Sequence, residues 1–175
     1  MAWPRIETID RRHCLELLTQ ACVGRVVFAV AGRSPGVVPV SYLLEGPTGA
    51  EAVVVRTTRG SRLGQAVLGR AVSFEVDDVH DSTREGWSVV ATGIAEEITD
   101  TERVHRLGER LQAWAPGFKD LFLSVPLQEV SGRRLVGHET VIQLPDTPAP
   151  RWREGNGWTP ATRTAAEYRT DFDGR

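Results

Sequence analysis

The sequence predicts a mainly β (α+β) fold: an antiparallel barrel, closed or partly closed, with six or seven strands and short flanking helices. Three observations lead to this fold class. Short valine-rich apolar runs recur along the chain between turns rich in Gly, Pro and Asp. Several of these runs alternate apolar and polar residues with period two. The helical patterns lie between groups of strands and do not alternate regularly with them, which argues against a parallel βαβ sheet.

The individual elements follow from these patterns in chain order. Residues 1–9 read as an irregular lead-in, and Asp10 can cap a helix that runs to about Ala21. Strands are expected at residues 23–30, 37–44, 51–57, 71–78, 87–95, 121–130 and 133–144. A polar link at residues 81–86 joins two of them and suggests an antiparallel pair. Pro39 cannot donate a ladder hydrogen bond, so its strand should lie at a sheet edge or be bulged there.

Two further helices are expected. A short one begins after Ser61 and ends near Gly69. Thr99 and Glu102 have the spacing of a capping box. The helix that they open is expected to end at Pro116-Gly117, and its apolar face would hold Val104, Leu107, Leu111 and Trp114.

Composition limits the classes of function. A chain of 175 residues with 41% hydrophobic residues suits one domain of about residues 1–144, followed by an extended C-terminal tail at 145–175. A net charge of −2 argues against a general nucleic-acid partner. No apolar run reaches the roughly 18 residues that span a membrane, and the N-terminus lacks a signal peptide's apolar core. A cytoplasmic location without a membrane partner is therefore expected.

The stretch Arg56-Thr57-Thr58-Arg59-Gly60-Ser61-Arg62 is the strongest candidate site. It joins an apolar strand to a short helix, and it gathers three arginines with three hydroxyl side chains. Ser61 is a plausible N-cap, so free N–H groups and the positive end of the helix dipole would point the same way. Gly60 would let the backbone turn tightly. These features indicate a phosphate site, and a solvated basic turn is the alternative.

Other reactive residues give weaker signals. Cys14 and Cys22 lie among apolar neighbours and read as buried free thiols. The four histidines share no metal-ligand spacing, so no metal site is assigned. The charged residues Arg103, Arg106 and Arg110 read as a solvated helix face. Gly132-Arg133-Arg134 could reach an anion or form a hairpin turn. No side chain is assigned as catalytic.

In the order of its motifs, the chain resembles the pyridoxamine 5′-phosphate oxidase-like, flavin-binding split-barrel family. The motifs are Cys14-Leu15-Glu16-Leu17-Leu18, Gly24-Arg25-Val26-Val27-Phe28, Val38-Pro39-Val40-Ser41-Tyr42, Val55-Arg56-Thr57, Gly60-Ser61-Arg62-Leu63, Val72-Ser73-Phe74-Glu75-Val76-Asp77, Gly86-Trp87-Ser88-Val89 and Ser131-Gly132-Arg133-Arg134. Each motif alone is weak, whereas their order and spacing together are fairly specific. The resemblance covers about residues 10–136 and not the tail.

The resemblance implies a homodimer with flavin mononucleotide (FMN) in the groove between two copies. The cofactor-binding residues that it implies are Pro39, Val40, Ser41, Arg56, Thr57, Thr58, Ser61, Arg62, Trp87 and Ser88. Pro39, Val40 and Ser41 would lie along the flavin ring, whereas Ser61 and Arg62 would hold the phosphate. Family members often carry Lys where this chain has Arg62. Trp87 could equally be a core aromatic, and Glu75 and Asp77 could line the groove or form dimer contacts.

The implied activity is a flavin-dependent oxidoreductase that acts on a small-molecule substrate, and a nicotinamide is a candidate electron donor. Oxidation of vitamin B6 itself is disfavoured, because residues 145–175 lack a recognisable substrate-binding segment of the true oxidases. Two alternatives stay open. One is a reductase that uses a deazaflavin, and extra arginines such as Arg59 would suit its longer acidic tail. The other is a non-enzymatic protein that holds a flavin or a tetrapyrrole such as haem.

Overall fold

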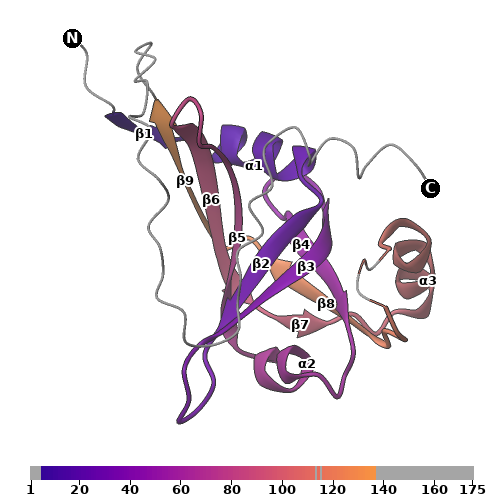
Figure 1. Ribbon diagram of the computed structural model, residues 1–175. Helices are drawn as coiled ribbons and strands as arrows, with labels where there is room; N and C mark the ends of the chain where they lie inside the picture. Colours follow the sequence, from indigo (N-terminus) through magenta and orange to yellow (C-terminus); the bar gives the residue numbers. More distant parts are fainter. Residues whose placement is uncertain (1–4, 113, 115, 137–175) are drawn as a thin grey trace, which may run out of the picture. The chain divides into compact units, whose positions relative to one another are not determined.

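A computed structural model describes residues 5–112, 114 and 116–136 of the chain, all within one compact unit. This part contains nine strands and three helices (Figure 1). The strands are β1 (Arg5–Ile9), β2 (Val23–Phe28), β3 (Gly36–Glu45), β4 (Ala52–Thr57), β5 (Ala71–His80), β6 (Glu85–Ile94), β7 (Glu96–Glu97), β8 (Leu121–Pro126) and β9 (Glu129–Val136). The helices are α1 (Arg11–Gln20), α2 (Arg62–Val67) and α3 (Thr101–Arg110).

All neighbouring strands pair antiparallel, in the order β1-β9-β6-β5-β2-β3-β4-β8-β7. The sheet curls until its distant parts meet beside Gly93 of β6. A Cβ atom added there would lie 1.9 Å from the carbonyl oxygen of Pro126 in β8. Gln128, between β8 and β9, donates its N–H to the carbonyl of Thr92 at 3.1 Å. The chain thus forms the split β-barrel that the sequence predicts, but with nine strands and not six or seven, because β1 and β7 form only by pairing with distant strands.

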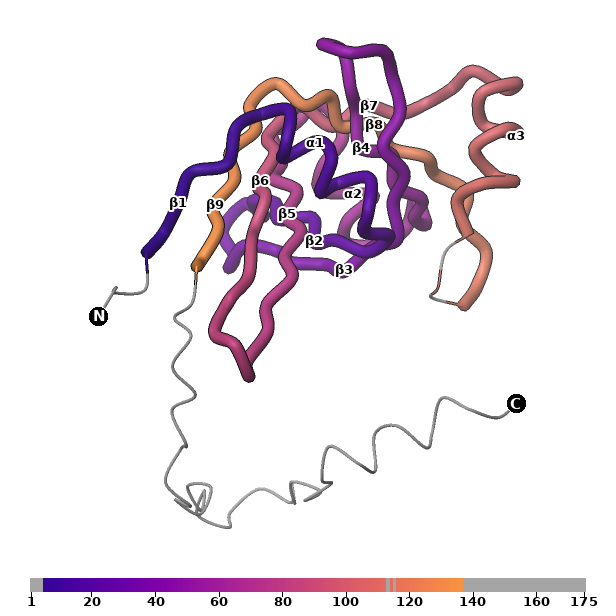
Figure 2. The backbone as a smooth tube through the Cα atoms, turned by 90° about the horizontal axis from the view of Figure 1, so that it is seen from above, coloured from indigo at the N-terminus to yellow at the C-terminus, as the bar shows by residue number. Residues whose placement is uncertain are grey.

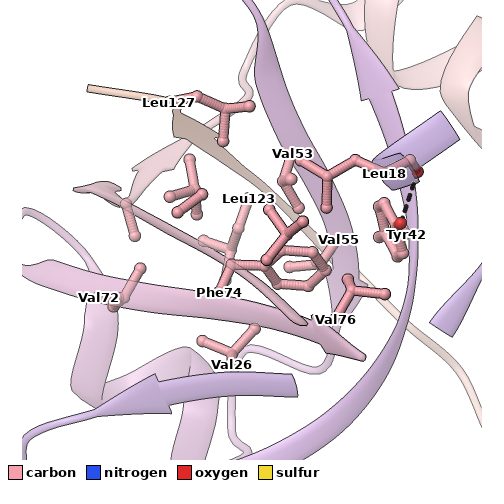
Figure 3. Packing of buried hydrophobic residues seen from close by; sticks show 14 of the residues in the cluster. Leu18, Val26, Tyr42, Val53, Val55, Val72, Phe74, Val76, Leu123 and Leu127 are labelled. Carbon is pink, nitrogen blue, oxygen red and sulfur yellow. Dashed lines mark hydrogen bonds between the residues drawn. The ribbon is translucent and has the colours of Figure 1, made fainter. Parts of the chain in front are cut away.

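The barrel interior holds the main hydrophobic core. Figure 3 shows Phe74 of β5 at its centre, with side chains from β2, β4 and β8 around it. Tyr42 meets the ring of Phe74 edge to face, at 4.7 Å between centroids, and donates its hydroxyl to the carbonyl of Leu18 at 2.6 Å. This bond ties α1 to β3 across the core.

A second, smaller core lies on the outer side of β4 and β8, beneath α3. It contains Val54, Ile98, Leu107, Leu111 and Phe122. Strand β4 is therefore buried on both faces, which explains why its sequence is an unbroken apolar run and not an alternating one.

The caps predicted for the first two helices are confirmed. The carboxylate of Asp10 accepts the N–H of His13 at 2.9 Å, and the hydroxyl of Ser61 accepts the N–H of Gly64 at 3.0 Å. The start of α3 was predicted one residue too early. Its N-cap is Asp100, which accepts the N–H of Arg103, and Thr99 has no such role.

The predicted end of α3 was wrong as well. The helix ends at Arg110, so Leu111 is its C-cap and Trp114 lies outside it. Val104, Leu107 and Leu111 do face the second core, whereas the Trp114 side chain is 73% exposed.

Both ends of the described segment depart from the prediction. Residues 5–9 form β1 because they pair with β9, a partner more than 120 residues away that no local pattern reveals. The last two strands break at Leu127 and Gln128. Gly132, Arg133 and Arg134 therefore lie inside β9 and do not form a hairpin turn. Figure 2 shows β1 and β9 running side by side at one edge.

Pro39 lies where the sequence prediction requires it. Strand β3 pairs with β2 over Gly36–Ser41 and with β4 only over Tyr42–Glu45. Among the described residues, the half of β3 that contains Pro39 therefore has a paired neighbour on one side only. The missing N–H of proline costs no ladder bond on the open side.

The predicted boundary at residue 144 and the tail at 145–175 lie outside the described residues. Cys14 is a buried free thiol as predicted, whereas Cys22 is exposed. None of the helices described is long and apolar enough to cross a membrane.

Candidate functional site

The turn between β4 and α2 brings together two hydroxyl side chains. The oxygens of Thr57 and Ser61 lie 3.1 Å apart, with Thr57 buried at the end of β4 and Ser61 at the N-cap of α2. The turn is held by a hydrogen bond from Ser61 N–H to the carbonyl of Thr58 at 2.9 Å. It is also packed closely, since a Cβ on Gly64 would meet the Thr58 carbonyl oxygen at 2.6 Å.

Two details of the predicted phosphate site need correction. Gly60 does not have a positive φ, so the turn does not depend on its conformational freedom. A Cβ there would meet nothing within 4 Å, so the backbone at Gly60 faces open space. Helix α2 has only six residues, and its Gly64 N–H is already bound by Ser61. Hydroxyl and guanidinium side chains, and not the helix dipole, are what this turn offers an anion.

The arginines of the turn have different surroundings. The Arg62 guanidinium is exposed and donates to the carbonyl of Ser34 at 3.1 Å, across to the β2–β3 turn. No carboxylate partner of Arg62 is found in the described part of the chain. This guanidinium can therefore bind an anion without first breaking an ion pair.

Arg59, in contrast, is already neutralised. Its guanidinium forms a two-bond ion pair with Glu97, and its backbone N–H donates to Asp120 at 2.8 Å. The hydrogen bonds from Arg59 hold the pKa of the Glu97 carboxyl below its ordinary value, and its backbone N–H does the same for the pKa of Asp120. Arg59 thus fixes the turn to β7 and to the start of β8.

Arg56 lies on the opposite face of β4 from Thr57, because successive strand residues point to opposite faces. Its guanidinium carbon lies 4.8 Å from the centroid of the Phe122 ring, and its Nε donates to the carbonyl of Lys119 at 3.0 Å. The structure therefore separates the Arg56 side chain from the hydroxyls of Thr57 and Ser61, which follow it closely in the sequence.

The segment before β8 contacts three of the residues that the sequence assigns to the cofactor. Trp114 donates its N–H to the hydroxyl of Ser41 at 3.3 Å. Thr58 donates its hydroxyl to the carbonyl of Phe118 at 3.0 Å, next to the bond between Arg56 and Lys119. No sequence signal indicated these contacts, because each joins residues at least 60 positions apart.

Residues 39–41 lie on the open half of β3. Pro39 is exposed, and Ser41 is half-buried on the same, outer face of the sheet. Val40 points the other way and packs against the main core, so only its backbone faces the open edge.

Trp87 and Ser88 lie apart from these residues within one chain. Their strand, β6, is separated from β3 by β5 and β2 in the sheet. The Trp87 side chain is half-buried and packs against the main core, as expected if Trp87 is a core aromatic. It also lines a shallow pocket of about 250 Å³ together with Arg134. Ser88 lies opposite Asp77, on the outer face of the sheet.

The outer face between these two groups carries an ion-pair cluster. Arg25 of β2 donates to Glu75 at 2.9 Å and also binds Asp77, both on β5. The carboxylates of Glu75 and Asp77 thus form ion pairs within the chain. Around this cluster the outer face exposes apolar side chains, including Val37 (56%) and Val90 (36%).

Comparison with known proteins identifies the family. A family model described as pyridoxamine 5′-phosphate oxidase matches residues 10–134, and the chain belongs to this family. An uncharacterized protein of Mycobacterium tuberculosis is 35% identical over 133 residues, which are 73% of this chain and 84% of the relative. The family resemblance stated from the sequence motifs is confirmed.

Two solved structures show the same fold. A conserved protein of unknown function from Corynebacterium diphtheriae is 32% identical, with a TM-score of 0.61 over 75% of this chain and 98% of that chain. An FAD-binding protein from Mycobacterium smegmatis is 23% identical, with a TM-score of 0.57 over 74% of this chain and 98% of that chain.

Proposed function

We propose that this protein is a flavoprotein that binds a flavin nucleotide by its 5′-phosphate and acts as an oxidoreductase on a small molecule. FMN is the smallest flavin that carries this phosphate. The observation that carries the proposal is the turn after β4, where the hydroxyls of Thr57 and Ser61 meet and Arg62 follows as the first residue of α2. The Arg62 guanidinium has no carboxylate partner among the described residues. The FAD-binding protein of M. smegmatis supports the proposal to the extent that the fold can hold a flavin.

The residues present fit the polar end of such a ligand. Hydroxyl groups can donate to phosphate oxygens, and the forked guanidinium of arginine can bind two of them at once. The open space beside Gly60 leaves room for the phosphate to approach the backbone. On the open edge of β3, Pro39 and Ser41 offer an exposed ring and a hydroxyl at which a planar group can lie.

When bound, a flavin would supply the redox chemistry, so the protein's part is binding and orientation. Thr57, Ser61 and Arg62 would hold the phosphate, and Ser41 would donate or accept a hydrogen bond near the ring. No described side chain is assigned as an acid, a base or a nucleophile. Substrate reduction with electrons from a nicotinamide donor is the reaction that we propose.

We further propose that two copies of the chain form the site. Within one copy Trp87 and Ser88 lie on β6, which β5 and β2 separate from the open half of β3, so a second copy would bring them to the ligand held along β3. The outer face, with exposed Val37 and Val90 around the Arg25 cluster, suits such a contact. A single-chain mass in light scattering would contradict this arrangement.

A deazaflavin reductase and a non-enzymatic flavin or haem carrier are the alternatives. The pairing of Arg59 with Glu97 weakens the case for a deazaflavin, because this arginine is not free to meet a longer acidic tail. Anaerobic addition of a nicotinamide donor separates an enzyme from a carrier. Bleaching of the bound chromophore indicates an enzyme, whereas an unchanged spectrum indicates a carrier.

The phosphate site is tested by Arg62→Ala, with FMN affinity measured by quenching of flavin fluorescence. We expect a loss of about 1.5–3 kcal/mol, the usual worth of a charge-assisted bond, or about 10- to 150-fold in Kd. Arg70→Ala is the matched control, since Arg70 is an exposed arginine just beyond the other end of α2. Equal FMN affinity in both variants would refute the assignment.

The family resemblance also predicts that Arg56→Ala weakens FMN binding by about 1.5–3 kcal/mol. Arg56 also stacks on Phe122 and binds the carbonyl of Lys119. The midpoint of thermal unfolding must therefore be measured beside the affinity, so that a loss of packing is not mistaken for a lost phosphate contact.

A further inference from the structure

We propose that a pocket beside Trp87 and Arg134 binds a small aromatic carboxylate. The pocket has a volume of about 250 Å³ and lies where the end of β9 meets the β5–β6 hairpin (Figure 1). It is called the Arg134 pocket below, and its lining includes His80, Glu85, Trp87, Arg134 and Val136. The inference goes beyond the proposed function, because none of the three residues proposed to hold the flavin phosphate lines this pocket.

The Arg134 guanidinium is a half-buried cation without a carboxylate partner in the described part of the chain. The other two half-buried arginines of that part have strong partners. Arg56 stacks on an aromatic ring and donates to a carbonyl, and Arg103 binds Glu45. For Arg134 the contact is with the imidazole of His13, at 3.4 Å between nitrogens, which is long for a hydrogen bond. A charge that has lost part of its water gains free energy when an anion pairs with it.

Two acidic side chains close to Arg134 do not neutralise it. Glu7 of β1 is its partner in the strand register, but the Glu7 carboxylate accepts a hydrogen bond from Arg5 at 2.8 Å. Glu85 lines the same pocket and forms no ion pair with Arg134. Apart from the imidazole of His80, the lining thus carries one guanidinium and one carboxylate. This balance suits a ligand with a single negative charge better than a dianion.

An aromatic side chain borders the guanidinium. Trp87 on β6 lies directly opposite Arg134 on β9, so the two side chains are neighbours on one face of the sheet. Val136 follows on the same face of β9. A ligand ring can cover these apolar atoms while its carboxylate accepts two parallel hydrogen bonds from the guanidinium. The volume is below the roughly 300 Å³ at which pockets for drug-sized ligands begin, which limits the ligand to about one ring.

The first test uses benzoate as the probe, in titration calorimetry on the full chain. Benzamide has the ring without the charge, and acetate has the charge without the ring. We expect benzoate to bind with a Kd of about 1 mM or lower. Benzamide and acetate should each bind at least about tenfold more weakly. Absence of benzoate binding overturns the inference, and so does binding of benzamide or acetate as tight as that of benzoate.

The second test changes the charges of the pocket. Arg134→Gln should weaken benzoate binding by about 10- to 150-fold, the usual worth of a charge-assisted bond. Arg133→Gln is the matched control, because Arg133 is the preceding residue, is exposed and points to the other face of β9. It should leave the Kd for benzoate unchanged. An equal effect of the two substitutions would overturn the assignment of Arg134.

A third variant guards against loss of folding as the explanation. Glu85→Gln removes a negative charge from the lining of the Arg134 pocket, so it should tighten benzoate binding by about 1.5- to fivefold. Misfolding cannot produce a gain in affinity. Weaker binding of benzoate by Glu85→Gln would mean that the carboxylate of the ligand does not lie in this pocket, which contradicts the inference.

Addition of saturating FMN separates this inference from the proposed function. Trp87 is shared between the pocket and the residues assigned to the flavin, so the two ligands are titrated together. The Kd for benzoate should stay unchanged. Displacement of benzoate by FMN would make the pocket part of the flavin site, which overturns the inference and leaves the flavoprotein proposal intact. Binding of benzoate as expected in a protein that takes up no flavin would support the inference and refute the proposed function.

Discussion

At the scale of single residues, tertiary contacts decide what a polar side chain does. Thr57 and Arg56 are adjacent in the sequence, yet one faces the hydroxyl of Ser61 and the other stacks on Phe122. Tyr42 shows the same dependence. Its hydroxyl lies in the core, only 3% of the residue is exposed, and the Leu18 carbonyl is its partner. Burial raises the pKa of Tyr42 well above its ordinary value, so the hydroxyl stays protonated and keeps donating.

Tyr42→Phe should therefore lower the free energy of unfolding by about 1–2 kcal/mol, because it removes a buried hydrogen bond and leaves the Leu18 carbonyl without a donor. Urea denaturation measures the change. Thr19→Val is the matched control, since the Thr19 hydroxyl bonds Glu16 on the exposed face of α1. Its effect should stay within about 0.5 kcal/mol. A cost for Tyr42→Phe as small as that of the control would show that the bond contributes little.

At the scale of elements, close packing and not helix propensity governs α2. Gly64 is a poor helix former, but a Cβ at this position would lie 2.6 Å from the Thr58 carbonyl oxygen and 2.9 Å from that of Arg59. The glycine lets the helix lie directly on the turn that holds Thr57 and Ser61. Gly108 of α3 has no such constraint, because its nearest contact would be Phe122 at 3.9 Å.

The two glycines thus give opposite predictions for the same substitution. Gly108→Ala should raise the midpoint of thermal unfolding, by the equivalent of about 0.5–1 kcal/mol, since alanine favours the helix. Gly64→Ala should lower it, because backbone carbonyl groups must move. Calorimetry on both variants tests the pair. Stabilisation by both substitutions would mean that the backbone of the turn before α2 can shift at little cost in free energy.

At the scale of the whole described segment, one ion pair joins parts that are distant in the sequence. Glu51, at the start of β4, accepts the N–H of Gly49 at 2.9 Å and a guanidinium hydrogen of Arg11 in α1 at 3.0 Å. Arg11 also donates to the carbonyl of Leu127, where the chain passes from β8 to β9. The hydrogen bond from the Gly49 N–H, then the bond from the backbone of Glu51 itself, and after these the contacts with Arg11 hold the pKa of the Glu51 carboxyl below its ordinary value.

A lowered folded-state pKa gives stability that is present above the unfolded-state pKa and lost as pH falls through the folded-state value. Glu51→Gln should therefore cost about 1–2 kcal/mol at neutral pH, and the cost should shrink below about pH 4.3. Urea denaturation at several pH values measures it. Glu16→Gln, in the exposed pair with Arg12, should cost less than about 0.5 kcal/mol throughout. A Glu51→Gln cost that did not change with pH would contradict the role of charge.

Much of the fold was predictable because local chemistry specifies it. Helix caps at Asp10 and Ser61, the antiparallel pair β5 and β6, and the edge position of Pro39 all follow from residues close together in the chain. The ordered motifs likewise sufficed to identify the family, which the match over residues 10–134 confirms. The predicted ligands at Thr57, Ser61 and Arg62 stay a prediction, although the structure does group them at one turn.

The features that the sequence did not reveal depend on contacts between distant residues. β1 forms only because β9 lies beside it, and Arg59 is neutralised only because β7 presents Glu97. The exposure of Trp114 follows from α3 ending at Arg110, where its apolar face has already covered the second core. Local pattern thus determined the elements and the family of this protein. The tertiary structure decided which side chains meet, because burial and charge pairing depend on segments that the fold alone brings together.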